Sequence, residues 1–251
     1  MLTYNVAGLP EGLSASRPVQ NLPLIGARLN RFDLALIQED FAYAELLRKH
    51  VRLPYSSRAF VRGERYDFGD GLSQFGRDEF DEPERITWAS CHGFTGFYFD
   101  CLTPKGVSFT RVRLSDNATL DVYNLHMDAG RSAGDQTARE QQLEQLQRLI
   151  RERSAGRAVL IGGDFNLTTT DSARLRAFER ETGTRDACAR LGCPEPGRID
   201  RILSRSSERI SLTPKRWRVD RSFVNERGEA LSDHMPVAVE FELELAQKAA
   251  E

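Results

Sequence analysis

The 251-residue sequence lacks long apolar stretches, because no run approaches the roughly 18–20 residues that a membrane-spanning helix needs. It also lacks an excess of one charge: 35 lysines and arginines face 37 aspartates and glutamates, for a formal net charge of −2. This balance gives no broad attraction for nucleic acid, although a local basic patch can still supply one. Low-complexity blocks, internal repeats and Ser/Gly-rich linkers are absent as well. These absences exclude an integral membrane protein and a wholly disordered chain, and they favour a single domain spanning residues 1–251.

Cysteine is scarce, and the four cysteines form two local pairs, Cys91 with Cys101 and Cys188 with Cys193. No CxxC motif or paired-histidine spacing flanks them, which argues against a zinc site. Local pairing into two disulfides is the simplest connectivity, and free buried thiols are the alternative. Disulfides would indicate an oxidising compartment. Because Met1 directly precedes a strand-like run, we also expect that an export signal was removed and that the protein is secreted or periplasmic.

Short β-like runs alternate with helical stretches, a pattern that predicts an α/β fold. One helix is clear over residues 137–153, where leucine and isoleucine recur at three- to four-residue spacing, and a weaker helix covers residues 42–50. Residues 63–93 are rich in glycine, charged and aromatic residues, which is typical of long loops around short strands. The expected strands are residues 2–6, 33–38, 106–112, 120–125, 158–161, 199–203 and 236–243.

Polar side chains stand at the ends of these apolar runs. An acidic residue at the tip of a buried strand is costly unless water, a partner or a cation receives it. Carboxylate and amide oxygens suit hard cations such as Mg²⁺ or Ca²⁺, and two histidines among them can serve as general base and as hydrogen-bond donor. No GxSxG nucleophile motif occurs, so the pattern favours metal-assisted hydrolysis over a covalent nucleophile. The residues are Asn5, Glu39, His126, Asp164, Asn166, Asp200, Asp233 and His234.

Six short motifs around these residues resemble, in order, the motifs of the endonuclease/exonuclease/phosphatase superfamily. Any one motif is weak evidence, whereas six in order along nearly the whole chain are strong. The resemblance implies a four-layer α/β sandwich, with two packed mixed β-sheets flanked by helices, that hydrolyses phosphoester bonds with a divalent cation. The motifs are Tyr4-Asn5-Val6, Ile37-Gln38-Glu39, Asn124-Leu125-His126, Gly163-Asp164-Phe165-Asn166, Ile199-Asp200 and Ser232-Asp233-His234-Met235-Pro236-Val237.

Within that superfamily, residues 69–72, 89–93 and 102–106 resemble the central segment of bacterial-type neutral sphingomyelinases. The resemblance implies a phosphodiesterase that uses Mg²⁺, or another divalent cation such as Mn²⁺ or Ca²⁺, and releases the phosphorylated headgroup of a sphingomyelin-type phospholipid. A nuclease and a sugar- or inositol-phosphate phosphatase share the motif set, so nucleic acid is not excluded as a partner. Nothing in the sequence indicates an oligomer, and a monomer is the default expectation.

The resemblance also implies roles for the residues that surround the cation. Asn5 and Glu39 are expected to hold or orient it, and Asp233 to belong to a second metal position or its surroundings. Asp164 and Asn166 are expected to position a water molecule and a phosphate oxygen.

The resemblance also implies roles in acid–base chemistry and charge stabilisation for the two histidines and Asp200. His234 is the expected general base, and Asp200 is expected to hold it in the required tautomer. His126 is expected to donate to the phosphoryl oxygens as negative charge develops on them.

Two features depart from the sphingomyelinase pattern. Only Trp217 and Phe223 stand in the segment where those enzymes carry an aromatic-rich hairpin for membrane contact, and Arg201 stands where many relatives have an aromatic residue. The aromatic residues within 94–99 are a candidate substitute for peripheral membrane contact, with burial in the core as the alternative. Lys105 is either a phosphate contact or a solvated lysine beside a turn.

Overall fold

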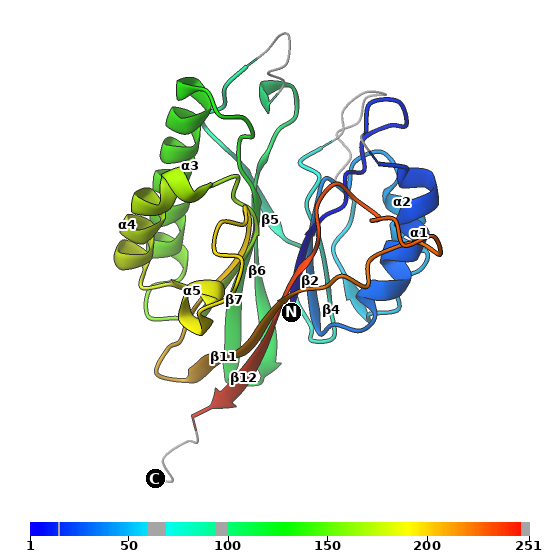
Figure 1. Cartoon of the computed structure of the whole chain (residues 1–251). Coiled ribbons are helices and arrows are strands. Elements are labelled where there is room, and N and C mark those ends of the chain that lie inside the picture. Colours follow the sequence, from blue (N-terminus) through cyan, green and yellow to red (C-terminus); the bar gives the residue numbers. More distant parts are fainter. Residues whose placement is uncertain (15, 60–68, 94–99, 247–251) are drawn as a thin grey trace.

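The computed structural model describes residues 1–14, 16–59, 69–93 and 100–246. Two six-stranded β-sheets pack against each other, and helices cover their outer faces, as Figure 1 shows. Each sheet contains both parallel and antiparallel strand pairs. This arrangement confirms the predicted four-layer α/β sandwich of two mixed sheets. The extent of the domain over residues 1–251 stays a prediction.

The first sheet combines the N-terminal part of the chain with its last two strands. Its elements are β1 (Leu2–Asn5), α1 (Pro18–Leu29), β2 (Leu34–Gln38), α2 (Ala44–Arg48), β3 (Tyr55–Ser56), β4 (Ser73–Gly76), β11 (Ile210–Val219) and β12 (Val237–Leu245). The strand order is β11-β12-β1-β2-β4-β3, and α1 and α2 lie on the outer face (Figure 1).

The second sheet is formed by the middle of the chain. Its elements are β5 (Glu84–Thr87), the 3₁₀ helix η1 (Asp100–Leu102), β6 (Gly106–Ser115), β7 (Ala118–His126), α3 (Ala133–Arg153), β8 (Val159–Asp164), the 3₁₀ helix η2 (Thr169–Asp171), α4 (Ser172–Thr182), β9 (Arg185–Asp186), α5 (Ala187–Leu191) and β10 (Asp200–Arg205). The strand order is β5-β6-β7-β8-β10-β9, and α3 and α4 cover the outer face (Figure 1).

Both sheets repeat one local arrangement. β1 runs parallel to β2, and β7 runs parallel to β8, with a helix in each connection. The carboxyl ends of parallel strands meet at one edge of a sheet, where ligand sites of α/β proteins commonly form. In the second sheet the register aligns His126 with Asp164, and Asp164 with Asp200 of the antiparallel strand β10. Three of the predicted site residues therefore lie side by side at one edge.

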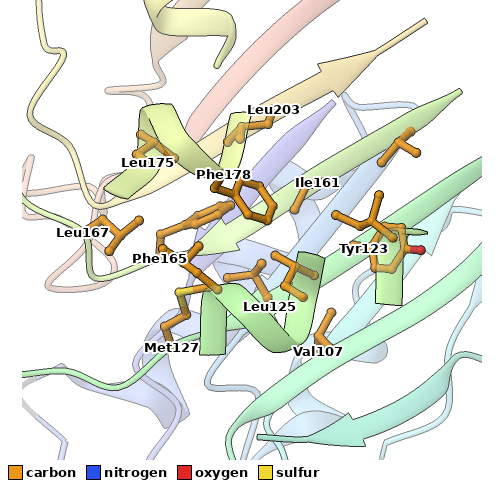
Figure 2. Packing of buried hydrophobic residues seen from close by; sticks show 14 of the residues in the cluster. Val107, Tyr123, Leu125, Met127, Ile161, Phe165, Leu167, Leu175, Phe178 and Leu203 are labelled. Atoms are coloured by element: carbon orange, nitrogen blue, oxygen red, sulfur yellow. The ribbon is translucent and has the colours of Figure 1, made fainter. Parts of the chain in front are cut away.

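Apolar packing fixes the strand that carries Asp164. Figure 2 shows the cluster between the second sheet and helices α3 and α4, in which Phe165 and Phe178 pack near Leu125. Phe165 follows Asp164 directly and is fully buried. Full burial of such a side chain contributes roughly 1.5–3 kcal/mol. The core therefore anchors the chain immediately beside the predicted site.

All seven expected strands are present, with ends that differ from the prediction by up to three residues. The helix predicted over residues 137–153 begins earlier, at Ala133, because Ser132 and Asp135 form a capping box that satisfies the first backbone N–H groups. The weaker helix predicted over residues 42–50 is shorter and spans Ala44–Arg48.

Helices α1 and α4 and strand β11 are the longest elements without a clear signal in the sequence. Helix α1 contains Pro23 in its interior as well as Pro18 at its start, and an internal proline normally argues against a helix. In helix α4 the large buried apolar side chains are only Leu175 and Phe178. Strand β11 contains Pro214 at an irregularity of its pairing with β12, together with several basic residues. Tertiary packing rather than local pattern stabilises these three elements.

The two local cysteine pairs form disulfides, Cys91–Cys101 and Cys188–Cys193, with Cα atoms 5.3 and 4.9 Å apart. These distances lie within the usual range for a disulfide. Of the two alternatives left open by the sequence, the structure therefore contains the disulfides.

The aromatic residues discussed for membrane contact differ in their surroundings. Phe223 is fully buried, with its ring 5.1 Å from that of Tyr4, and Trp217 is half-buried on β11. The aromatic residues within 94–99 lie outside the described residues. In the part of the chain that the structure describes, no helix is both long and apolar enough to cross a membrane.

Candidate active site

The candidate site lies at the sheet edge formed by the ends of β7 and β8 and the start of β10. His126, Asp164 and Asp200 occupy neighbouring register positions there, and all three are buried. His126 Nε2 lies 3.5 Å from Asp164 Oδ2. Because backbone pairing sets the spacing of the three strands, these side chains are held in place before any ligand binds.

The first sheet contributes Asn5 at the end of β1 and Glu39 directly after β2. The Asn5 side-chain nitrogen donates to Glu39 Oε1 at 2.9 Å and to Asp164 Oδ2 at 3.3 Å, which connects the two sheets at the site. Glu39 has a φ of 57°, in the left-handed region that non-glycine residues rarely adopt. The Gly8 N–H donates to the Glu39 carbonyl at 2.9 Å, and a Cβ at Gly8 would lie only 2.4 Å from that oxygen. Glycine at this position therefore permits the Glu39 conformation.

His234 reaches the site on the segment before β12. Its Nδ1 lies 3.0 Å from both carboxylate oxygens of Asp200, and its Nε2 lies 3.7 Å from Asp164 Oδ2. The Ser232 hydroxyl donates to the Asn5 carbonyl at 2.8 Å and accepts the His234 N–H at 3.3 Å, so this segment is attached to β1. Asp200 thus orients the imidazole with Nε2 toward Asp164, an arrangement that fixes which nitrogen is available for chemistry.

Two predicted site residues lie at the margin of this cluster. Asp233 is exposed and borders a surface pocket together with His234. Asn166 has a φ of 50°, and its side-chain nitrogen donates to the Met127 carbonyl at 3.0 Å. Its backbone N–H donates to Asp164 Oδ1 at 3.0 Å. In this conformation Asn166 holds the Asp164 carboxylate through its backbone.

Burial and mutual charge perturb the acid–base groups. Burial, reinforced by the negative charge of Asp200, raises the pKa of Asp164 to about 6. Burial by itself lowers the pKa of His234, but the hydrogen bond and charge of Asp200, with the charges of Asp164 and Asp233, outweigh it and raise that pKa to about 9. Carboxyl and imidazole groups that perturb one another in this way are typical of catalytic sites.

His126 differs from His234 because its environment favours the neutral imidazole. Burial lowers the pKa of His126 well below 6.5, and the positive charges of Lys105 and His234 act in the same direction. Lys105 pairs with Asp100 and donates to the Met127 carbonyl at 3.4 Å. Lys105 is thus paired with Asp100 rather than solvated alone, and its charge helps to lower the pKa of His126.

The donor set has the chemistry of a hard-cation site. One ligand atom each from Asp164, Asp200 and His234 lie within 4.8 Å of one another. The carboxylates are buried, and burying several negative charges together is costly unless a positive group compensates them. Oxygen-rich ligands suit Mg²⁺ or Ca²⁺. The residues present therefore fit a divalent cation.

The predicted metal ligands differ in how they meet this cluster. The Glu39 carboxylate faces it, with Oε1 3.9 Å from His126 Nε2. The Asn5 amide oxygen accepts the Ala7 N–H at 3.0 Å, and its nitrogen is directed at the carboxylates. Asp233 lies at the exposed margin. Geometry thus favours Asn5 as a residue that orients the carboxylates.

Two further residues contact the site. Arg198 donates to the Met235 carbonyl at 2.9 Å, and its guanidinium lies 3.6 Å from Asp200 Oδ2. Trp88 donates from its indole nitrogen to the His126 carbonyl at 2.7 Å. Arg198 stands two residues before Asp200 in the sequence, and this spacing could have indicated that its guanidinium lies near the Asp200 carboxylate. Trp88 is distant in sequence, and no local pattern points to it.

The comparisons with known proteins agree with this geometry. Residues 2–234 match the sequence profile of the endonuclease/exonuclease/phosphatase family. Sphingomyelinases from Mycobacterium bovis and from Mycobacterium tuberculosis strain H37Rv are each 34% identical to this chain over 267 residues. The matched region covers 96% of this chain and 52% of each relative, so the chain spans about half the length of these curated relatives.

Solved structures share the fold at lower identity. D. rerio TDP2 in complex with a single-strand DNA product has a TM-score of 0.73 at 19% identity, and the match covers 96% of this chain and 97% of that one. A double mutant of the beta toxin from Staphylococcus aureus with bound magnesium ions has a TM-score of 0.69 at 16% identity, covering 95% and 97%. These likenesses show the fold alone, whereas the family profile matches nearly the whole chain and includes every residue of the site. The chain belongs to the endonuclease/exonuclease/phosphatase family.

Proposed function

We propose that this chain is a divalent-metal-dependent phosphodiesterase that hydrolyses a sphingomyelin-type phospholipid and releases its phosphorylated headgroup. The observation that carries the proposal is the convergence on Asp164 of His126, His234 and Asn5, which come from both sheets. Family membership supports the reaction class, and the 34% identical relatives described as sphingomyelinases support the substrate.

His234 acts as the general base in this proposal. Asp200 accepts the Nδ1 proton, so Nε2 takes the proton of the attacking water. With a pKa of about 9 the imidazole is protonated at neutral pH in the absence of a cation. A cation bound by Asp164 and Asp200 would lower the pKa of His234 toward neutrality, because it would weaken the negative potential that stabilises the imidazolium.

His126 stabilises the negative charge that develops on the phosphoryl oxygens. Its neutral imidazole donates from Nε2, and a donor fixed in a water-poor environment is most effective at this point of the reaction. Asp164 positions the attacking water. The backbone N–H of Asn166 donates to the Asp164 carboxylate and keeps it in place.

Glu39, Asp164 and Asp200 supply the carboxylates that hold Mg²⁺, or Mn²⁺ or Ca²⁺ in its place. Asn5 orients two of these carboxylates, and Asp233 is the candidate for a second metal position. When bound, the cation would neutralise negative charge on the phosphoryl group. The bound magnesium ions of the beta toxin, a protein of the same fold, support this choice of metal.

Peripheral contact with a lipid surface is part of the proposal. Among the described residues, Leu13 and Leu102 are the most exposed large apolar side chains, at 71% and 60%. The segment after β1 and the segment around η1 lie at the same end of the molecule in Figure 1. Exposed apolar side chains at one end of a protein favour contact with an apolar phase.

Export from the cytoplasm is the location proposed for the protein, and a monomer is its proposed state. The two disulfides support export, since such bonds persist in oxidising compartments. Intact mass should rise by about 4 Da on reduction if both bridges form in the purified protein. Light scattering checks the monomer.

One assay panel tests the proposed activity. Wild type and His234→Ala are compared on sphingomyelin vesicles, plasmid DNA and inositol polyphosphates, with Mg²⁺ and with a chelator. We expect headgroup release that requires the cation, and a loss of turnover on the order of 10²–10⁴-fold in the variant. His50→Ala, at an exposed histidine after α2, is the matched control and should keep wild-type turnover. Equal turnover in His234→Ala contradicts the general base, and faster cleavage of DNA or inositol phosphates contradicts the lipid substrate.

A further inference from the structure

Another pocket lies at the β9 edge of the second sheet, between α4, β9 and α5. Its volume is about 690 Å³. Pro196 borders both this pocket and the pocket beside His234, so the two are neighbours across one loop. Buried Leu175 and Cys188 line it, and the Cys188–Cys193 disulfide fixes the adjoining turn. The walls are therefore held by core packing and by a covalent bridge.

Four arginines and two acidic residues border this pocket, and both acids are already bonded. Asp186 accepts Arg201 at 2.7 Å through one carboxylate oxygen and the Cys188 N–H at 2.8 Å through the other. Glu179 accepts the Asp186 N–H at 2.7 Å. Arg201, the residue that departs from the sphingomyelinase pattern, is itself buried and also donates to backbone carbonyls. The buried ion pair thus cancels the charge of Asp186 from within the wall.

The other three arginines of the pocket are exposed and lack a carboxylate partner. Arg176, Arg185 and Arg190 form no ion pair with any carboxylate among residues 1–14, 16–59, 69–93 and 100–246. Arg190 makes one long hydrogen bond, 3.5 Å to a backbone carbonyl of β11. Arg174 on the same helix as Arg176 does pair, with two carboxylates at 3.3 and 3.5 Å. The pocket therefore carries three arginine charges without an ion-pair partner, against the single carboxylate charge of Glu179, whose bond to a backbone N–H does not cancel it.

We propose that this arginine pocket, defined by Arg176, Arg185 and Arg190, binds a phosphate-bearing anion. Guanidinium groups match the oxygens of a phosphate with paired hydrogen bonds, and three of them around one cavity favour a phosphate over a single carboxylate. A chain with a net charge of −2 gains little from general attraction of anions, so the local cluster sets the preference. A lipid headgroup and a soluble phosphate share this chemistry.

Binding to the arginine pocket is measured without turnover, on chelator-treated protein. The probes are inorganic phosphate, followed by calorimetry, and phosphatidylcholine vesicles with about one-fifth phosphatidylglycerol, followed by co-sedimentation. The test variant is R176Q/R185Q/R190Q. The matched control is R148Q/R151Q/R227Q, which removes the same charge from three exposed arginines outside the pocket.

We expect the test variant to bind at least one probe on the order of tenfold more weakly than the control variant, with an unchanged melting temperature in both. A loss confined to inorganic phosphate identifies a soluble ligand, and a loss confined to the vesicles identifies a lipid headgroup. Equal binding by the two variants overturns the proposal. Since no step requires hydrolysis, a chain without phosphodiesterase activity would still give a clear result.

Discussion

The interface between the two sheets has two ends of opposite chemistry, although the same strands form both. Away from the site, Leu36 of β2 and Val122 of β7 lie in an apolar cluster between the sheets. Two residues further along the same strands stand Gln38 and Asn124, which bond to each other across the interface at 2.6 Å. Side chains two apart on a strand share a face. Each strand therefore presents an apolar side chain and then a polar one to the opposite sheet.

Asn124 carries most of the polar contact. Its side-chain nitrogen donates to the Ile37 carbonyl at 3.0 Å and to the Ser73 carbonyl at 3.1 Å, and its oxygen accepts from Gln38. The residue is fully buried. Apolar contact holds the sheets together without a required direction, whereas hydrogen bonds are directional and fix their relative position.

That difference explains why the polar end lies directly beneath the site. Glu39 follows Gln38 in the chain, and His126 stands two residues after Asn124. Glu39 Oε1 and His126 Nε2 face each other across the sheets at 3.9 Å. A shift of one sheet against the other would change the separation of Glu39 and His126. The neighbouring hydrogen bonds of Asn124 oppose such a shift and so preserve the geometry that the chemistry needs.

Replacing Asn124 with leucine should have the largest effect. It removes the side-chain donor to the buried carbonyls of Ile37 and Ser73. It also removes one acceptor of the Gln38 amide, which keeps its bonds to Thr3 and Leu36, and each hydrogen bond lost in a buried place is costly. We expect a loss of about 2–4 kcal/mol in the free energy of unfolding, measured by urea denaturation, and a fall in kcat that exceeds any change in KM.

The matched control for this prediction is Val122→Ala, on the same face of the same strand. The cavity it creates should cost about 2–3 kcal/mol, a similar loss, but at the apolar end. Its kcat should stay close to that of wild type at a temperature where both variants are folded. If the two variants lose activity equally, stability rather than register explains the effect of Asn124.

The site next to the polar end should also make stability depend on pH, through His234. The pKa of His234 is raised from 6.5 to about 9 in the folded protein. Its contribution to the free energy of unfolding is therefore fully present below pH 6.5 and is lost as the pH rises through 9. The contribution amounts to at most about 3 kcal/mol. In chelator, the free energy of unfolding of wild type should fall relative to His234→Gln between pH 6.5 and 9.5. Parallel pH profiles of the two proteins would contradict the assignment.

Much of the site was predictable because most of its residues lie at the ends of strands. His126 and Asp164 follow apolar runs, and parallel register places such residues together without any knowledge of side-chain contacts. The division between ligands and orienting residues was not predictable in this way. Whether Asn5 presents its oxygen or its nitrogen to the carboxylates depends on the turn that brings the Ala7 N–H to it.

The parts of the fold without a sequence signal depend on contacts between distant segments. Helix α1 forms despite Pro23 because its buried face packs on the first sheet, where Leu22, Ile25 and Leu29 join the core. Trp88 likewise acquires its place beside His126 only when β5 and β6 pair. Patterns of a few residues report strand ends and capping boxes, but they do not report which buried surface a segment will meet.

The smallest effect is expected at a second polar contact between the sheets, farther from the site. Thr110 of β6 donates from its hydroxyl to Gln74 Oε1 of β4 at 3.1 Å, and both residues are buried. Thr110→Val keeps the shape of the side chain and removes this one hydrogen bond, so we expect a loss of about 1 kcal/mol in the free energy of unfolding. Neither residue adjoins Glu39 or His126 in the chain, and kcat should be unchanged. A fall in kcat comparable to that of Asn124→Leu would show that any hydrogen bond across the sheets supports the reaction, and that the position of Asn124 directly behind the site has no special role.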